Sequence, residues 1–276
     1  MTLPPPITSR SNARVKALRA GFSGDAAQPG ELVGIEGETL LAEALRSGLR
    51  VDSIFVRQGS EAALEVPELH KTQPVPVFIL SKDVFASAVH TGSPQGIAAL
   101  IAIPPARGEE AERRAGVVLV LESMQDPGNL GTLLRAAEAF GVSQVMATPD
   151  TVNPWNPKAI RASTGSVFRV PVRRLPLNEA KDWMTTRGVR LYAAVAQVRD
   201  AVACMDADLA APCALMIGNE GAGLSPAALA LADERIHIPC RTESLNAAAA
   251  GATLLYEAMR QRLAKMIPTA PSGERA

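Results

Sequence analysis

Short apolar runs alternate with helical patterns along most of the chain, and one such pair lies at its middle. Val117–Leu121 is an unbroken, β-branched apolar run of the length expected for a buried parallel strand. The turn sequence Asp-Pro-Gly at 126–128 follows it. A helix is predicted from Asn129, a favourable N-cap residue, to Gly141. Its apolar positions recur at helical spacing: Leu130, Leu133, Leu134, Ala137 and Phe140.

The first hundred residues repeat this alternation. Strands are predicted at Leu32–Ile35, Val51–Val56, Val75–Leu80 and Gly96–Ile103, and helices at Ser9–Ala20 and Glu38–Arg46. The alternation predicts a small α/β domain with parallel strand pairing over residues 1–103. A linker is predicted at 104–116, because two prolines precede a charged stretch that is poor in apolar residues.

A second α/β domain with a parallel sheet is predicted over residues 117–264. Its further strands are expected at Gln144–Thr148, Phe168–Val172, Arg190–Ala196, Cys213–Ile217 and Arg235–Ile238. Its further helices are expected at Lys158–Ser163, at Asn178–Thr186, after the N-cap Ser225, and from Ser244, a natural helix cap, to Leu263. The last residues, 265–276, are expected to form a disordered tail.

Composition narrows the class of protein. A hydrophobic content of 47% is enough for two cores. No stretch approaches the roughly 20 apolar residues of a membrane span, and the start of the chain lacks the apolar core of a signal peptide, so we expect a cytoplasmic protein without membrane contact. Basic and acidic side chains number 28 each, so any basic surface for a nucleic acid must be local.

The cysteines support neither a disulfide framework nor a metal site. Cys204, Cys213 and Cys240 are odd in number, form no CxxC motif and have only His237 nearby. We therefore interpret them as buried thiols and expect no metal.

Arg135 is the main catalytic candidate, because it does not belong to the apolar stripe of its predicted helix. It shares a face with Thr132 and Glu138, and that face can lie at the carboxyl edge of the sheet, where open α/β sheets bind ligands. The alternative is an ordinary surface pair with Glu138, which would contribute only about 0.3 to 0.5 kcal/mol.

A glycine-rich turn at 218–223 ends the predicted strand Cys213–Ile217. Its sequence, GNEGAG, matches neither GxGxxG nor the P-loop pattern, which disfavours nucleotide binding. Glycines at this edge instead allow a flat ligand to lie against bare backbone. Glu220 in the turn is either functional or merely solvated. Asn246, in an otherwise apolar helix, is expected to bond neighbouring loops or a ligand.

Two local groups of cations are candidates for RNA contact. The first lies on the predicted helix Ser9–Ala20 and comprises Arg10, Arg14, Lys16 and Arg19. The second lies within Thr151–Asn178, which contains no acidic residue, and comprises Lys158, Arg161, Arg169, Arg173 and Arg174. Solvated faces are the alternative for both groups. Trp155 could stack on a base, although packing in its own turn is also possible.

Four long segments, in order and spacing, resemble the sequence motifs of the SpoU/TrmH family of RNA ribose 2′-O-methyltransferases, within the SPOUT superfamily. They are QDPGNLGTLLRAAEAFG, NPWNPKAIRASTGSVFRVPV, LMIGNEGAGLS and IPCRTESLNAAAAGATLLYE, and the resemblance covers residues 116–263. GIEGETLLAEALRSG and SPQGIAAL look like the small N-terminal substrate-binding domain of that family, which resembles ribosomal protein L30e in fold. Family members often carry a valine-rich run where this chain has Ala247–Ala250.

The resemblance implies a parallel α/β sheet whose C-terminal segment passes through a loop to form a deep trefoil knot, an arrangement otherwise essentially absent from proteins. It also implies S-adenosylmethionine as cofactor, held largely by backbone groups within the knot. The cofactor-binding set that it implies is Gly218, Glu220, Ile238, Ser244, Leu245 and Asn246.

The acceptor that the resemblance implies is a ribose 2′-hydroxyl of a structured ribosomal or transfer RNA. The implied catalytic set is Arg135, Asn129 and Glu220. A guanidinium group cannot act as an ordinary base at neutral pH, so Arg135 is expected to orient the hydroxyl and the adjacent phosphate. Asn129 is alternatively only a helix cap. The family also implies a homodimer through the catalytic domain, next to whose interface the active sites lie.

The sequence speaks against two other functions. A nucleotide-dependent oxidoreductase is excluded because the required glycine motif is missing. A non-catalytic RNA-binding protein that keeps the knotted fold as a scaffold is disfavoured, because a scaffold would not need the polar residues that the chemistry uses. Those residues are Asn129, Arg135, Glu220, Ser244 and Asn246.

Overall fold

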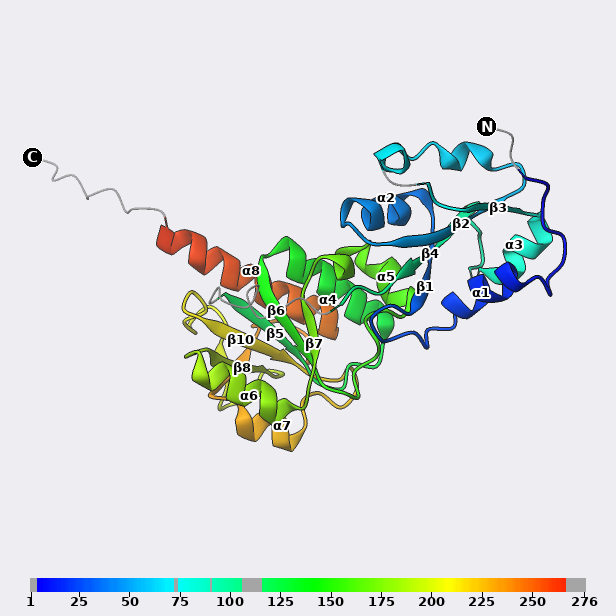
Figure 1. The fold of residues 1–276 in the computed structure, drawn as a ribbon. Helices are drawn as coiled ribbons and strands as arrows, with labels where there is room; N and C mark the ends of the chain where they lie inside the picture. The colour runs from blue at the N-terminus through cyan, green and yellow to red at the C-terminus, as the bar shows by residue number, and fades with distance from the viewer. Residues whose placement is uncertain (1–3, 72–73, 90, 106–115, 267–276) are drawn as a thin grey trace, which may run out of the picture. The chain divides into compact units, whose positions relative to one another are not determined.

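The computed structural model describes residues 4–71, 74–89, 91–105 and 116–266 (Figure 1). The chain forms two compact units. The first comprises residues 1–107, 126–135 and 152–169, and the second comprises 108–125, 136–151 and 170–276. Most of the predicted linker at 104–116 lies outside the described residues. So does the predicted tail from residue 267 onward, whereas residues 265 and 266 belong to a helix.

The sheet of the first unit is mixed rather than parallel. Its strands are β1 (Leu32–Glu36), β2 (Val51–Arg57), β3 (Val77–Leu80) and β4 (Ile97–Ala102), in the order β1-β4-β2-β3. Only β2 and β3 pair in parallel, while β4 runs antiparallel to both β1 and β2. The expectation of parallel pairing was therefore wrong. Apolar periodicity predicts that a segment is a strand, but the direction of a strand depends on partners far away in the sequence.

Helices α1 (Ala13–Gly21), α2 (Glu38–Arg46), α3 (Lys82–Ala88) and α5 (Pro157–Ser163) belong to the first unit, together with the 3₁₀ turns η1 (Glu61–Leu64), η2 (Pro67–Lys71) and η4 (Ser166–Phe168). α1 begins later than predicted, because Asn12 accepts a hydrogen bond from the Arg14 backbone and caps the helix. Val15 and Leu18 of α1 pack with Phe55 and Phe85 in one apolar core.

The sheet of the second unit is parallel, as predicted. Among the described residues it has seven strands in the order β7-β6-β5-β10-β8-β11-β9. The strands are β5 (Val117–Leu121), β6 (Val142–Ala147), β7 (Val172–Arg174), β8 (Arg190–Ala194), β9 (Val202–Ala203), β10 (Cys213–Ile217) and β11 (Glu234–His237). The central strands β5 and β10 are fully buried, which agrees with their continuous apolar sequences.

The strand predicted at Phe168–Val172 was wrong. Thr164 and Gly165 both have positive φ angles, so α5 ends in a tight turn that continues directly into η4. Phe168 is buried in this turn and stacks on Trp155, with ring centroids 6.1 Å apart. Extended backbone begins only at Val172.

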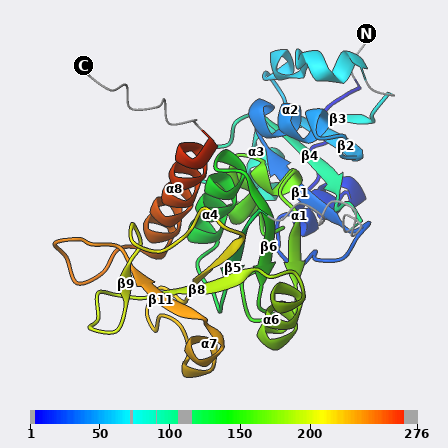
Figure 2. The same cartoon turned by 90° about the vertical axis from the view of Figure 1, so that its left-hand side faces the viewer.

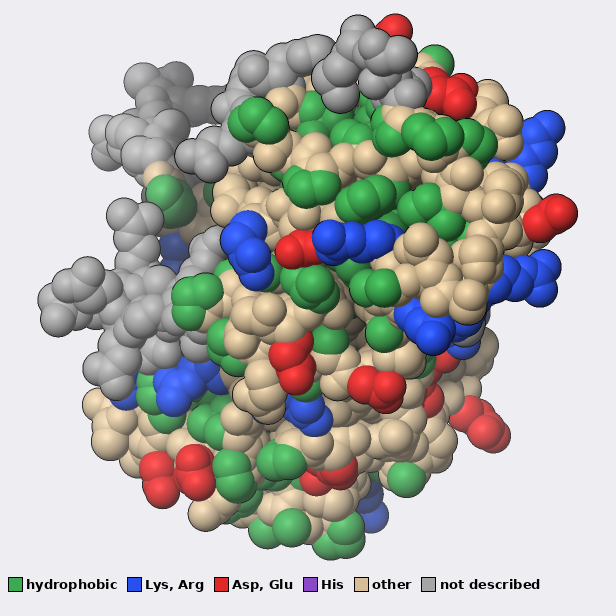
Figure 3. Space-filling view, turned by 45° about the vertical axis from the view of Figure 1, so that its right-hand side comes forward, with side chains coloured by type: hydrophobic (Ala, Val, Ile, Leu, Met, Phe, Trp, Pro, Cys, Tyr) green, Lys and Arg blue, Asp and Glu red, His purple; other side chains and the backbone are tan. Residues whose placement is uncertain are grey.

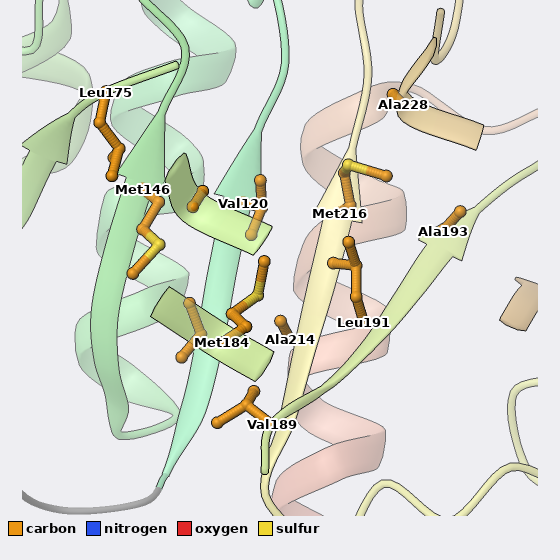
Figure 4. Packing of buried hydrophobic residues seen from close by; sticks show 12 residues of the cluster. Val120, Met146, Leu175, Met184, Val189, Leu191, Ala193, Ala214, Met216 and Ala228 are labelled. Atoms are coloured by element: carbon orange, nitrogen blue, oxygen red, sulfur yellow. The ribbon is translucent and has the colours of Figure 1, made fainter. Parts of the chain in front are cut away.

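The seven-stranded sheet is covered on both faces. Helices α6 (Leu177–Thr186) and α7 (Pro226–Leu231) lie on one side of the strands, and α8 (Ala247–Met266) lies on the other (Figure 2). Figure 4 shows the apolar cluster under α6 and α7, in which Val120, Met146, Met184, Leu191 and Met216 lie together. Within the described residues, no helix is both long and apolar enough to cross a membrane. The threading of the chain into a knot stays a prediction.

Two predicted helix caps were wrong and one is confirmed. α4 (Pro127–Ala139) is capped by Asp126, whose carboxylate accepts from the Asn129 backbone N at 2.7 Å, so Asn129 lies inside the first turn. Asn246 rather than Ser244 caps α8, because its side-chain oxygen accepts from the backbone N of the second and third residues after it. Ser225 caps α7 as expected.

We predict that Met216→Ala destabilises the second unit by about 2 to 5 kcal/mol, since Met216 is 0% exposed in the cluster of Figure 4 and its removal leaves a cavity. Met205→Ala is the matched control, because Met205 is 58% exposed and its loss should change stability by less than about 0.5 kcal/mol. Urea denaturation of both variants measures the difference. Equal midpoints for the two variants would contradict the packing described here.

Candidate active site

A pocket lies at the carboxyl ends of β8, β10 and β11, within the second unit. It encloses about 330 Å³. Three loops form it, at 194–197, 218–223 and 238–245, and the first turns of α8 close one side. The carboxyl edge of a parallel sheet is where ligands bind in open α/β proteins, so the position of the pocket already indicates a ligand site.

The glycine turn at 218–223 forms the wall of the pocket after β10. Asn219 and Gly223 exchange backbone hydrogen bonds of 3.0 and 2.9 Å, and the Asn219 side chain accepts from the backbone N of Gly221 and Ala222. A Cβ added at Gly218 would lie 2.5 Å from the Gly223 oxygen and 2.5 Å from the Leu224 nitrogen. The turn is therefore closed by its own backbone, and only glycine fits at its first position.

The pocket is lined mainly by apolar side chains, with a few polar groups among them. Five of the six residues expected to bind the cofactor line it: Gly218, Glu220, Ile238, Ser244 and Leu245. Asn246 instead caps α8 next to the pocket. The sequence analysis missed the 194–197 loop, Cys240 and Glu243. The loop could have been found, because the predicted strand Arg190–Ala196 ends at the same edge of the sheet.

Glu220 connects the glycine turn to the segment that precedes α4. Its carboxylate accepts from the Gln125 backbone N at 3.4 Å. Asn219 makes a second link, because its side-chain nitrogen donates to the Ser123 carbonyl at 2.9 Å. Glu220 is thus part of the pocket wall and also contacts the loop before the predicted catalytic helix, which favours a functional role over a merely solvated charge.

Ser123 is held in a left-handed conformation, with φ 54°. Its hydroxyl donates to Asp150, and its backbone N donates to the Thr148 hydroxyl oxygen at 2.9 Å. The hydrogen bond from Ser123, followed by one from Thr148, lowers the pKa of the Asp150 carboxyl below its ordinary value. A charged acceptor therefore keeps this strained turn in place at neutral pH.

Glu122 is a further residue that the sequence analysis missed. It follows β5 directly, and it is buried, with 7% of its surface exposed. Its carboxylate accepts from both the backbone N and the hydroxyl of Ser225, the residue that caps α7. A charged residue directly after a fully apolar strand is the signal that could have identified it, because a buried carboxylate needs such partners.

Arg135 and Asn129 lie on the part of α4 that belongs to the first unit. Arg135 is exposed, and its Nη1 donates to the Thr164 hydroxyl oxygen at 3.3 Å. The guanidinium group therefore contacts Thr164, whereas the alternative considered from the sequence was a surface pair with Glu138. Asn129 is half-buried in the first turn of α4, where its backbone N is bound by Asp126.

The predicted RNA-contacting cations also lie in the first unit and are exposed: Arg10, Arg14, Lys16, Lys158 and Arg161. Two other cations of the second basic stretch, Arg169 and Arg174, bind groups of the protein itself. Arg169 pairs with Glu43 at 2.6 Å, and Arg174 donates to two backbone carbonyls. Trp155 packs against Phe168, as its turn suggested. Figure 3 shows basic side chains interspersed with acidic and apolar ones on the visible face.

The thiols differ in environment. Cys204 and Cys213 are buried as expected, whereas Cys240 is half-buried and lines the pocket. Burial raises the pKa of the Cys213 thiol to about 11. Among the described residues, no group of three potential metal ligands comes together.

Comparison with known proteins matches both parts of the chain. The SpoU rRNA Methylase family model matches residues 116–256, and a model for RNA 2'-O ribose methyltransferase substrate binding matches residues 35–106. The 23S rRNA (guanosine(2553)-2'-O)-methyltransferase RlmP of Bacillus subtilis is 36% identical over 224 residues, which cover 80% of this chain and 86% of the relative. The 23S rRNA (uridine(2479)-2'-O)-methyltransferase of Streptomyces viridochromogenes is 30% identical over 275 residues, covering 96% of this chain and 95% of the relative.

A solved structure adds the cofactor. The SpoU methyltransferase AviRb from Streptomyces viridochromogenes, in complex with AdoMet, matches with a TM-score of 0.80 at 27% identity, over 91% of this chain and 98% of that chain. Together with the family match, this cofactor-bound structure shows that the chain is an S-adenosylmethionine-dependent methyltransferase. The chain belongs to the SpoU family of RNA ribose 2′-O-methyltransferases, and its substrate is RNA.

The pocket fits S-adenosylmethionine in size and in chemistry. Its volume of about 330 Å³ lies within the range of about 300 to 1,000 Å³ that is typical of small-molecule sites. Ile217, Ile236 and Leu254 supply apolar walls, while Glu220 and Glu243 supply acceptors for a positively charged ligand.

We predict that Gly218→Ala lowers the affinity for S-adenosylmethionine at least about tenfold, or about 1.4 kcal/mol, because the new methyl group displaces the backbone of the turn. Gly221→Ala is the matched control within the same turn, since its Cβ would meet only the Asn219 side chain, at an ordinary contact distance of 3.6 Å. Calorimetric titration of both variants measures the difference. Wild-type affinity in Gly218→Ala would contradict this view of the pocket wall.

Proposed function

We propose that this enzyme methylates a ribose 2′-hydroxyl of ribosomal RNA, with the cofactor in the pocket formed by the 194–197, 218–223 and 238–245 loops. The observation that carries the proposal is the pocket itself, to which five residues chosen from the sequence contribute. The ribosomal substrate is supported by the two 23S rRNA methyltransferases among the relatives.

Backbone groups of Gly218, Ile238 and Leu245 hold the cofactor, and apolar side chains such as Ile217 and Ile236 lie beside it. S-adenosylmethionine supplies an electrophilic methyl group on a positively charged sulfur. That charge is lost during transfer, so a desolvated, largely apolar pocket favours the transition state over the ground state. Ser244 and Asn246 brace the third loop, and Asn246 does so as the cap of α8.

Arg135 orients the attacking 2′-hydroxyl and the adjacent phosphate. A guanidinium group stays protonated at neutral pH and offers several donors in one plane, so it suits an anionic neighbour and does not act as a general base. The phosphate receives the proton of the hydroxyl. Asn129 shapes the same corner of α4, and Glu220 keeps the Gln125 backbone next to the glycine turn.

RNA binds through the cations of the first unit. Arg10, Arg14, Lys16, Lys158 and Arg161 are exposed and belong to the same unit as Arg135. Phosphate contacts of this kind position an RNA without reading its sequence. Residues 1–103 act as the substrate-binding domain and 117–264 as the catalytic domain, and the protein works in the cytoplasm without a metal.

We predict that cells lacking this protein lose a 2′-O-methyl mark from ribosomal RNA. Wild-type protein should restore the mark and Arg135→Ala should not, because losing one donor to a developing oxyanion costs about 2.7 to 4 kcal/mol, or about a hundredfold to a thousandfold in rate. Arg135→Lys should rescue little, since an ammonium group lacks the planar fork. The readouts are mass mapping of the RNA and single-turnover methyl transfer.

Three outcomes would change this proposal. A mark lost from transfer RNA instead would overturn the ribosomal assignment. A rate of methyl transfer by Arg135→Ala within a few-fold of wild type would show that Arg135 is an ordinary surface residue without a catalytic role. If cells lacking the protein kept every 2′-O-methyl mark on all of their RNA, the alternative of a non-catalytic RNA-binding scaffold would be favoured.

We also propose that the protein forms a homodimer through α8. Tyr256 and Leu263 lie seven residues apart on one face of this helix and are each 51% exposed. Phe140 extends the apolar surface, with its ring edge-on to Tyr256 at 5.9 Å. We predict twice the mass of one chain in light scattering at micromolar concentration, and a single-chain mass for Leu263→Glu. Met205→Glu, which is exposed elsewhere, should stay dimeric, and a monomeric wild type would exclude the dimer.

A further inference from the structure

We propose that Thr164 is a positioning residue for Arg135, and that α2 of the substrate-binding region holds the turn that carries Thr164. The proposal rests on the catalytic role proposed for Arg135. All the residues involved belong to the first compact unit, although they come from three separate stretches of the sequence.

Thr164 adopts a conformation that its side chain disfavours. It ends α5 with φ 50° and ψ 38°, in the left-handed region. Glycine is the usual residue at such a helix end, and a β-branched residue there is a true outlier whose backbone is strained. Glycine does occupy the next position, Gly165, with φ 82°. The end of the helix alone therefore does not explain why a threonine occupies position 164.

The Thr164 hydroxyl supplies that reason. Its oxygen accepts from the Arg135 Nη1 at 3.3 Å, so the side chain that makes the backbone strained is also the one that holds the guanidinium group. Arginine has four rotatable side-chain bonds, and an exposed guanidinium group without such a partner samples many positions. A second fixed point reduces this freedom before the RNA arrives.

The contact between α4 and α5 brings the two residues together. A Cβ at Gly131 of α4 would lie 2.5 Å from the Ala159 carbonyl oxygen and 2.9 Å from the Ser163 nitrogen, so the two helices meet with no room for a side chain. Arg135 follows Gly131 by four residues, or about one helical turn, and therefore lies on the same face. That face leads directly to the end of α5, where Thr164 lies.

Helix α2 holds the turn that follows Thr164. Glu43 of α2 pairs with Arg169 at 2.6 Å, and Ser47 accepts from the same guanidinium nitrogen at 3.1 Å. Gly165 lies against α2 so closely that a Cβ there would be 2.9 Å from the Glu43 Cβ. The Glu43–Arg169 pair is partly shielded, with side chains 18% and 33% exposed.

The substrate-binding region thus contributes to more than RNA affinity. Glu43 lies within residues 35–106, which match the substrate-binding model. Its pairing with Arg169 fixes the turn that carries Thr164, and Thr164 fixes Arg135. The rate of methyl transfer should therefore depend on a residue of α2 even when the RNA and the cofactor are saturating.

The first experiment is a double-mutant cycle in the full-length protein, read by single-turnover methyl transfer to ribosomal RNA at saturating S-adenosylmethionine. Thr164→Val keeps the β-branched shape and its backbone strain while removing the hydroxyl, and it should slow transfer by about tenfold to a hundredfold. Thr164→Ser, which keeps the hydroxyl, should stay within about threefold of wild type. In the Arg135→Ala background, Thr164→Val should cause no further loss, because its effect acts through Arg135.

The second experiment compares two carboxylates near α2. Glu43→Gln removes the charge that holds Arg169 and should slow transfer about tenfold, with the cofactor affinity from calorimetry unchanged. Glu38→Gln is the matched control, because Glu38 is an exposed carboxylate in the first turn of the same helix and should leave the rate unchanged.

Two results would overturn the positioning role of Thr164: wild-type transfer by Thr164→Val alongside an inactive Arg135→Ala, or an undiminished Thr164→Val effect in the Arg135→Ala background. Wild-type transfer by Glu43→Gln would overturn the link to α2. Wild-type transfer by Arg135→Ala is a separate result, since it overturns the catalytic role of Arg135 in the proposed function and removes the basis of this inference.

Discussion

The pairing of β5 with β10 is the constraint on which the cofactor-binding unit depends. Leu121 lies opposite Ile217 at the end of both strands, and the Glu122 backbone N adds a bond of 2.9 Å to the Ile217 carbonyl. The segment before α4 and the glycine turn therefore leave the sheet at the same level. The buried Glu122 carboxylate then holds Ser225 at the far end of that turn. One strand pair and one carboxylate thus set both ends of the pocket wall.

The polar contacts around this pair stiffen the wall further. Asn219 closes the glycine turn on itself and also reaches the Ser123 carbonyl, while Glu220 reaches the Gln125 backbone. Each of these bonds ties a side chain of the glycine turn to a backbone group of the same turn or of the segment before α4. These bonds hold the pocket wall in place without a ligand, and such preorganisation lowers the entropic cost of binding.

The sequence was sufficient for the parallel sheet of the second unit and for the glycine turn, because buried strands and glycine turns are local signals. The resemblance to a family added five residues that line the pocket, Gly218, Glu220, Ile238, Ser244 and Leu245, but not the rest of its lining. It was insufficient where the outcome depends on distant partners. The antiparallel placement of β4 follows from pairing across the first sheet, and nothing within Ile97–Ala102 specifies direction. The caps were misassigned by two or three residues, because Asp126 and Asn246 compete with equally good capping residues nearby.

The sequence also did not predict which segments of the chain make up the first unit. Along the sequence, residues 126–135 and 152–169 come between segments that form strands of the second sheet. They nevertheless belong to the same compact unit as the N-terminal strands. The Asn153 side chain, for example, donates to the Ala26 carbonyl at 2.6 Å. Contacts between segments more than a hundred residues apart leave no periodic signal. The division into residues 1–103 and 117–264 follows motif order, whereas the compact units follow packing.

A pocket wall made of backbone has an evolutionary consequence. Where a ligand is recognised by side chains, most substitutions at the site are selected against, whereas a turn that binds through its own amides and carbonyls constrains only the glycines that leave it room. Gly218 is such a position, because a Cβ there meets the backbone of the same turn. The proposed methyl-donor site can therefore stay the same while the side chains proposed to contact RNA change.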